Sequence, residues 1–184
     1  MFLARWLPTV VAFPLGGYLA VQSVGSIDGP LAAAAAGGLA GAVIGLAQWL
    51  ALRPFGVGPR WVALTTVGMA AGSAVSAVLT GAGTDVQSLV LSGLVTGAAI
   101  GGAQAVALGR GPAARAAWTG AVTGAWALGW LTTSSIGVDV ERGYAVFGLS
   151  GTLVATTLTG LVLARLVGAG QLAPATVVGP EVAA

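Results

Sequence analysis

The fold is decided by residues 41–72, GAVIGLAQWLALRPFGVGPRWVALTTVGMAAG. Two apolar runs rich in small residues flank the segment 53–60, which holds two arginines, two prolines and two glycines. Proline and glycine are typical of turns, and positive charge gathers on the cytoplasmic side of membrane helices. The stretch therefore predicts a transmembrane helical hairpin whose turn faces the cytoplasm.

The composition extends this interpretation to the whole chain. Of the 184 residues, 57% are apolar and 7% are charged. A soluble domain carries roughly 25% charged residues, because its surface must face water. So few charges cannot solvate a body of this length, and the sequence predicts that lipid surrounds it.

The absent residue types exclude several functions. The chain has no lysine, histidine or cysteine, so we expect no retinal Schiff base, no haem, zinc or iron–sulfur site and no disulfide. Its carboxylates lie in connecting or terminal segments, where none would serve as a base for a membrane-embedded nucleophile: Asp28, Asp85, Asp139, Glu141 and Glu181. We therefore expect no enzyme activity, no cofactor and no metal. The net charge of +2 and the scattered arginines argue against nucleic-acid binding.

A bilayer core about 30 Å thick needs about 20 helical residues to cross it, and six apolar runs reach this length. We predict an all-α membrane bundle of six transmembrane helices, at about 6–24, 30–52, 61–79, 86–108, 113–133 and 144–167, and a flexible tail over 168–184. An alternative interpretation of the first run is a cleaved signal peptide, because Arg5 precedes it and small residues follow it.

Charge gives the orientation. With both termini in the cytoplasm, six of the seven arginines lie on the inner side, as the positive-inside rule requires: Arg5, Arg53, Arg60, Arg110, Arg115 and Arg165. Four of the tryptophans, Trp6, Trp49, Trp61 and Trp118, fall near the same boundary, where an indole is well solvated by headgroups. We expect a multi-pass protein of a bacterial cytoplasmic membrane.

An internal repeat divides the chain into three helix pairs. Residues 41–53, GAVIGLAQWLALR, return as GAAIGGAQAVALG over 97–109, a spacing of 56. Arg5-Trp6, Arg60-Trp61 and Trp118 follow similar spacings. The expected repeats are about 1–55, 56–111 and 112–167. Each holds two spans, so all three share one orientation.

Small residues follow one face of several spans at four-residue spacing. Glycine stripes let membrane helices approach closely, so we expect helix packing along Gly37, Gly41, Gly45, Gly93, Gly97 and Gly101, and along the pairs Gly68–Gly72 and Gly120–Gly124. These contacts would hold the protomer together, or leave one seam open for another protein or a flat ligand.

The repeat-equivalent Gln48 and Gln104 are the most informative polar positions. A primary amide inside a span needs hydrogen-bond partners. We expect a structural clamp in which the amides bond to each other or to backbone carbonyls. A ligand or ion contact is the alternative. The many Ser and Thr residues either bond to carbonyls of their own helix or line a polar path. The aspartates Asp28, Asp85 and Asp139 either cap helices or form a cation-attracting ring.

The pattern Gly-x-x-x-Gly-x-x-Gln-Trp-x-x-Leu-Arg, a short loop and then Trp is present at Gly41, Gly45, Gln48, Trp49, Leu52, Arg53 and Trp61. In this segment the chain resembles a widespread group of small bacterial multi-spanning membrane proteins. The second copy departs from the pattern, with Ala105 in place of Trp and Gly109 in place of Arg. The resemblance implies a helical membrane protein and no particular activity.

Two functions remain. The first is a non-enzymatic accessory or scaffold subunit, with a membrane-protein partner or a second copy of itself in the bilayer. The alternative is a carrier, channel or membrane substrate-binding component for a neutral or lipophilic small molecule. A polar cavity between the helices favours the second. A dry, closed bundle with one exposed glycine seam favours the first.

Overall fold

The computed structural model describes residues 1–136 and 148–168, and this part of the chain is helical with no strand. The elements are α1 (Phe2–Trp6), η1 (Leu7–Val11), α2 (Ala12–Val24), α3 (Pro30–Leu52), η2 (Arg53–Phe55), α4 (Arg60–Thr80), α5 (Val86–Leu108), α6 (Pro112–Ser135) and α7 (Leu149–Gly168). Helices α3 and α5 begin and end at the predicted residues. The tail was predicted to begin at residue 168, but Gly168 is the last residue of α7. The start of the last predicted span, residues 169–184 of the predicted tail, and Asp139, Glu141, Arg142 and Glu181 lie outside the described residues.

Within the described residues, five helical segments are long and apolar enough to cross a membrane: Phe2–Val24, Pro30–Phe55, Arg60–Thr80, Val86–Leu108 and Leu149–Leu166. Helix α6 has 24 residues but is the least apolar of the long helices. Its three tryptophans, several threonines and Arg115 lower its mean hydropathy. The described part of the chain is therefore an apolar helical bundle, which is compatible with a membrane protein.

The first span is not one regular α-helix. Between α1 and α2 the chain forms the 3₁₀ segment η1, with Pro8 near its start. Proline has no N–H to donate and its ring clashes with the carbonyl one turn back, so the backbone tightens here. The break separates Trp6, in the last position of α1, from α2.

Local sequence sets the other helix boundaries. Pro30 and Pro112 begin α3 and α6, where the missing N–H has no cost, and Gly81 and Gly109 end α4 and α5 in the left-handed conformation. Asp85 caps α5 by accepting a hydrogen bond from the Ser88 N–H at 3.0 Å. The same expectation for Asp28 was wrong: Gly29 is the N-cap of α3 and no side chain caps that helix.

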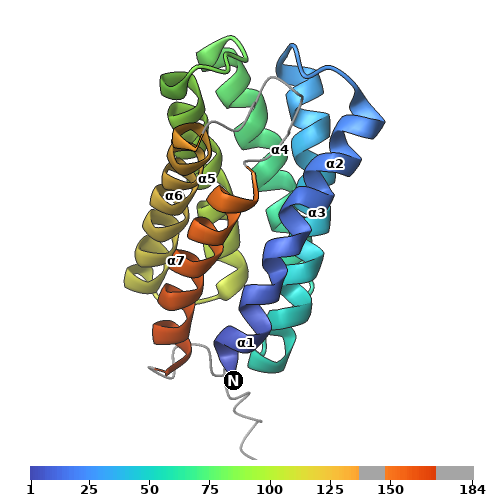
Figure 1. Cartoon of the computed structure of the whole chain (residues 1–184). Coiled ribbons are helices and arrows are strands. Elements are labelled where there is room, and N and C mark those ends of the chain that lie inside the picture. The colour runs from blue at the N-terminus through green and yellow to red at the C-terminus, as the bar shows by residue number, and fades with distance from the viewer. Residues whose placement is uncertain (137–147, 169–184) are drawn as a thin grey trace, which may run out of the picture.

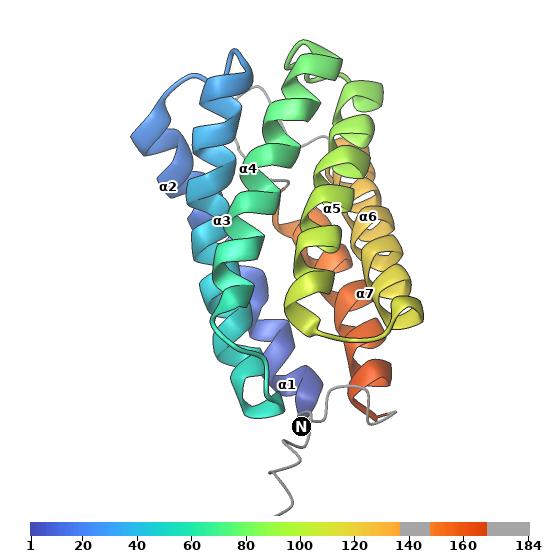
Figure 2. The same ribbon diagram turned by 180° about the vertical axis from the view of Figure 1, so that it is seen from behind.

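The helices stand side by side in chain order, and α7 returns to α1 and η1 to complete a ring (Figures 1 and 2). The chain start, the α3–α4 and α5–α6 connections and the end of α7 lie at one end, here called the Arg end. All arginines of the described part belong to these segments: Arg5, Arg53, Arg60, Arg110, Arg115 and Arg165. The opposite end, here called the Asp end, carries Asp28 in the α2–α3 connection and Asp85 in the α4–α5 connection.

The predicted glycine stripes lie between helices of the same chain. A Cβ added to Gly37 or Gly41 would come within 2.9 Å of α4 atoms, and one added to Gly45 would lie 3.0 Å from Thr65 Cβ. Gly93, Gly97 and Gly101 face α6 with corresponding distances of 2.8 to 3.0 Å. Gly68 and Gly72 face α5 as closely. The predicted pair Gly120–Gly124 differs, because no neighbouring atom of the described residues lies within 4 Å of either added Cβ.

The tryptophans at the Arg end do not face the headgroups as expected. Trp6, Trp61 and Trp118 are 0%, 0% and 1% exposed, and Trp49 is half-buried. The Trp118 ring centroid lies 6.4 Å from that of Trp6 and 5.9 Å from that of Trp61. The helices α1, α4 and α6 thus each place one indole inside the bundle, where a large apolar ring fills the interior. We call these three residues the tryptophan cluster.

Candidate functional site

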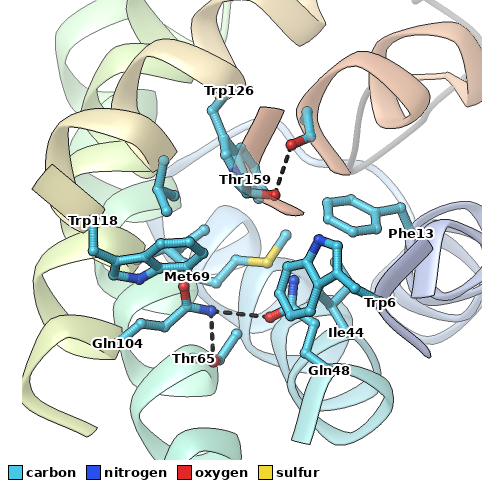
Figure 3. Close-up of a pocket in the computed structure, with 13 residues that line it drawn as sticks. Trp6, Phe13, Ile44, Gln48, Thr65, Met69, Gln104, Trp118, Trp126 and Thr159 are labelled. Carbon is cyan, nitrogen blue, oxygen red and sulfur yellow. Dashed lines mark hydrogen bonds between the residues drawn. The ribbon is translucent and has the colours of Figure 1, made fainter. Parts of the chain in front are cut away.

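The two glutamines meet inside the bundle, in the half nearer the Arg end (Figure 3). Gln48 on α3 and Gln104 on α5 are 7% and 2% exposed. Gln104 Nε2 donates hydrogen bonds to Gln48 Oε1 at 3.1 Å and to Thr65 Oγ1 at 3.0 Å. Gln48 Oε1 also accepts from Trp61 Nε1 at 3.2 Å. These four residues, here called the amide site, join α3, α4 and α5.

The hydrogen bonds of the amide site use only part of its capacity. A primary amide has two N–H donors and a carbonyl that accepts two hydrogen bonds. Gln48 Nε2 and Gln104 Oε1 make no hydrogen bond within the described part of the chain. Neither atom is fully enclosed by protein atoms, and both residues line a small space with a volume of about 10 Å³.

Aromatic and aliphatic side chains enclose this space. Ile44, Met69, Ile100 and Val122 line it, and Trp6 and Trp118 of the tryptophan cluster complete the wall. Trp6 Nε1 donates to the Thr156 carbonyl of α7 at 2.9 Å, which fixes α1 against the last helix. The Arg-end half of the bundle is therefore tightly closed.

A much larger space occupies the other half. The described residues enclose a cavity of about 320 Å³ that extends from Trp126 to the α2–α3 and α4–α5 connections. We call it the Asp-end cavity. Ser26 and Thr84 in its wall are exposed, so it reaches the surface at that end. Trp126 lines both this cavity and the small space at the amide site.

The described part of the wall of the Asp-end cavity is rich in hydroxyls. Its polar side chains are Ser26, Ser73, Ser76, Thr80, Thr84, Ser92 and Thr96, with the indoles of Trp126 and Trp130. No charged residue is among the described residues that line it. Ser76 donates to Ser92 across the α4–α5 interface at 2.7 Å. Ser73 and Thr96 make no hydrogen bond within the described residues, so their hydroxyls are available to a ligand.

Most hydroxyls elsewhere bond to a carbonyl of their own helix. Thr65, Thr66, Thr80, Thr123, Thr132, Ser134, Ser135, Thr152 and Thr159 each donate to the carbonyl four residues earlier. This is the common arrangement in membrane helices. Of the cavity hydroxyls, Thr80 follows this pattern, whereas Ser76 bonds to Ser92 and neither Ser73 nor Thr96 bonds within the described residues.

The aspartates do not come together with the other candidate residues. Asp85 is fully exposed, and hydrogen bonds from the Ser88 side chain and backbone lower its pKa. Asp28 lies at the same end in a different connection. No group of three or more acidic, His or Cys residues that could hold a metal occurs in the described ranges 1–136 and 148–168.

Sequence reasoning missed two features of the site. It assigned Trp61 to the membrane boundary, whereas Trp61 is a hydrogen-bond donor to Gln48. It also treated the Ser and Thr residues as one group and did not separate the cavity hydroxyls from the rest. The near-equal spacing of Trp6, Trp61 and Trp118 was the available signal, because equivalent positions of a repeat lie at one level of a bundle.

No protein-family model, curated protein or solved structure matches this chain.

Proposed function

We propose that the chain is a six-span protein of a bacterial cytoplasmic membrane that binds a small neutral molecule in the Asp-end cavity, as a carrier, channel or membrane substrate-binding component. The observation that carries this proposal is the hydroxyl-lined cavity of about 320 Å³. Ligand pockets are mostly apolar, with a few polar groups that fix orientation, and begin at about 300 Å³. The cavity has this size and this mixture.

The orientation follows from charge. All six arginines of the described part lie at the Arg end, which by the positive-inside rule faces the cytoplasm. The Asp-end cavity would then open outward, and both termini would be cytoplasmic. A neutral wall disfavours an ionic ligand, because an ion leaving water for the membrane interior loses its hydration without gaining a countercharge.

The absence of native cysteine makes the cavity testable by cysteine labelling. Ser73→Cys lines the Asp-end cavity, and Met69→Cys lies one turn deeper on α4, in the wall of the amide site. A small, hydrophilic, membrane-impermeant thiosulfonate added to intact cells should label Ser73→Cys and leave Met69→Cys unlabelled. An unlabelled Ser73→Cys in folded protein would contradict an outward-facing cavity.

Ligand binding is tested by purification from native membranes and mass spectrometry of retained small molecules. Ala33→Phe fills the cavity from α3, where Ala33 is 6% exposed, and Leu31→Phe is the matched control, since Leu31 is 85% exposed. A molecule retained by the wild type and Leu31→Phe but lost from Ala33→Phe would support the proposal. Equal retention by all three would refute binding in this cavity.

A second candidate function is an accessory or scaffold subunit. The open Gly120–Gly124 face of α6 supports it, because the other predicted stripes are covered by helices of the same chain. Closely packed small residues are the usual contact between membrane helices. In the same purification, a membrane protein or second copy that cross-links to Gly120→Cys at fixed stoichiometry would favour this role.

A further inference from the structure

The amide site contains two unused hydrogen-bonding atoms that face one small space. Gln48 Nε2 is a donor and Gln104 Oε1 is an acceptor, and neither has a hydrogen-bond partner among the described residues. Both side chains are more than nine-tenths buried. Leaving such groups unpaired in an apolar interior costs about 1 to 3 kcal/mol each. The arrangement therefore favours an occupant that both accepts and donates.

The size of the space restricts that occupant. Its volume is about 10 Å³, and a cavity needs about 10 to 15 Å³ to hold one water molecule. A buried water typically makes about three hydrogen bonds to otherwise unsatisfied groups. Any larger ligand would have to displace Ile44, Met69 or Ile100, which are at most 2% exposed.

We propose that Gln48 and Gln104 form a binding site for a single water molecule, which accepts a hydrogen bond from Gln48 Nε2 and donates one to Gln104 Oε1. The hydrogen bond from Gln104 Nε2 to Gln48 Oε1 orients the two amides, so that the Gln48 N–H and the Gln104 carbonyl remain for the water. Thr65 and Trp61 fix this choice, because the Thr65 hydroxyl already donates to its own helix and the indole can only donate.

The site lies next to the Asp-end cavity, with Trp126 as the shared wall. The proposal rests on the proposed function for the route of entry, since water reaches the site from the outward-facing cavity. The bundle is then hydrated as far as the amide site, and the tryptophan cluster is the barrier between this water and the cytoplasm.

The test measures magnetisation transfer from water protons to side-chain amide nitrogens in the full chain, reconstituted in lipid bilayers under conditions of slow amide exchange. The probe is water itself. The chain has five glutamines, and isotope-labelled glutamine with a Gln48→Leu spectrum assigns the Gln48 signal. We expect direct transfer to Gln48 Nε2 in the wild type.

Two variants of α3 sharpen the result. Ile44→Phe places a larger side chain in the space, and transfer to Gln48 should be lost. Leu46→Phe, at a position 47% exposed, should leave it unchanged. Absence of transfer to Gln48 in the wild type overturns the proposal, whether or not Ile44→Phe folds. Undiminished transfer in a folded Ile44→Phe variant also overturns it. Neither result depends on a ligand in the Asp-end cavity, so failure here is distinct from failure of the proposed function.

Discussion

The hydrogen bond between Gln48 and Gln104 predicts a measurable coupling between the two side chains. Gln104→Leu keeps a similar volume but removes the bonds to Gln48 Oε1 and Thr65 Oγ1. Gln48→Leu removes the bonds from Trp61 and Gln104. Side-chain hydrogen bonds between membrane helices average about 0.6 kcal/mol and reach about 1.7 kcal/mol, so we expect each variant to lose about 1 kcal/mol.

One of these bonds is shared, so the double variant loses three bonds rather than four. The free energies of unfolding should therefore be non-additive by about 0.6 kcal/mol, the value of one interhelical bond. Differences in desolvation between Gln and Leu affect the single variants but largely cancel in this coupling term.

Equilibrium unfolding in mixed micelles of a mild and a denaturing detergent, followed by tryptophan fluorescence, gives the three free-energy differences. Gln87→Leu is the control, because Gln87 is exposed in the first turn of α5, and it should not couple to Gln48→Leu. Strict additivity of Gln48→Leu and Gln104→Leu would mean that the amides do not bond in the bilayer, and the reasoning about the amide site would be refuted.

Three further predictions concern packing, the barrier and pH. Gly97→Val should destabilise the protein by about 1 to 3 kcal/mol, the range for overpacked cores, because an added Cβ lies 2.9 Å from Thr123 Cα. Gly102→Val is the matched control in the same unfolding assay, because no neighbouring atom of the described residues lies within 4 Å of an added Cβ there. Trp6→Leu should raise the osmotic water permeability of proteoliposomes above that of the wild type, while Trp49→Leu should not, since Trp6 lines the space at the amide site and Trp49 does not. Equal permeabilities would place the barrier elsewhere. The hydrogen bonds that lower the pKa of Asp85 stabilise the fold while the carboxyl is ionised. This stabilisation is complete at pH values above the unfolded-state pKa of about 3.9, and it disappears as the pH falls through the lower pKa of the folded state. Asp85→Asn should remove that acid dependence, and an unchanged stability–pH profile would contradict the capping interaction.

Much of the helical pattern could be predicted because it depends on local chemistry. The bounds of α3 and α5 follow from a starting Pro30, a capping Asp85 and a terminal Gly109. The break at Pro8 was not predicted. Proline is tolerated in the first turn of a helix, and the sequence does not show that the five-residue helix α1 comes before Pro8.

The direction in which side chains point was harder to predict. A tryptophan near the end of a span suits a headgroup or a core equally well, and hydropathy cannot distinguish them. Trp6, Trp61 and Trp118 lie inside the bundle, at most 1% exposed. Which hydroxyls face the Asp-end cavity likewise depends on packing between helices, because Ser73 and Ser76 share one helix with Thr65 and Thr66, whose hydroxyls bond to their own backbone.

The distribution of side-chain volume along the bundle explains why one half is closed and the other open. At the Arg end, three indoles and the aliphatic wall fill the interior. At the Asp end, the residues that α3 and α4 contribute to the cavity wall are small, namely Ala33, Ala36, Gly37, Ser73, Ser76, Ala77 and Thr80, and the larger side chains come mainly from α5 and α6. Close glycine contacts hold the α3–α4 and α5–α6 backbones together around both halves, so the helices cannot collapse to fill the space. The cavity is thus a consequence of residue size inside a rigid frame, and its hydroxyls make it suitable for a neutral polar ligand.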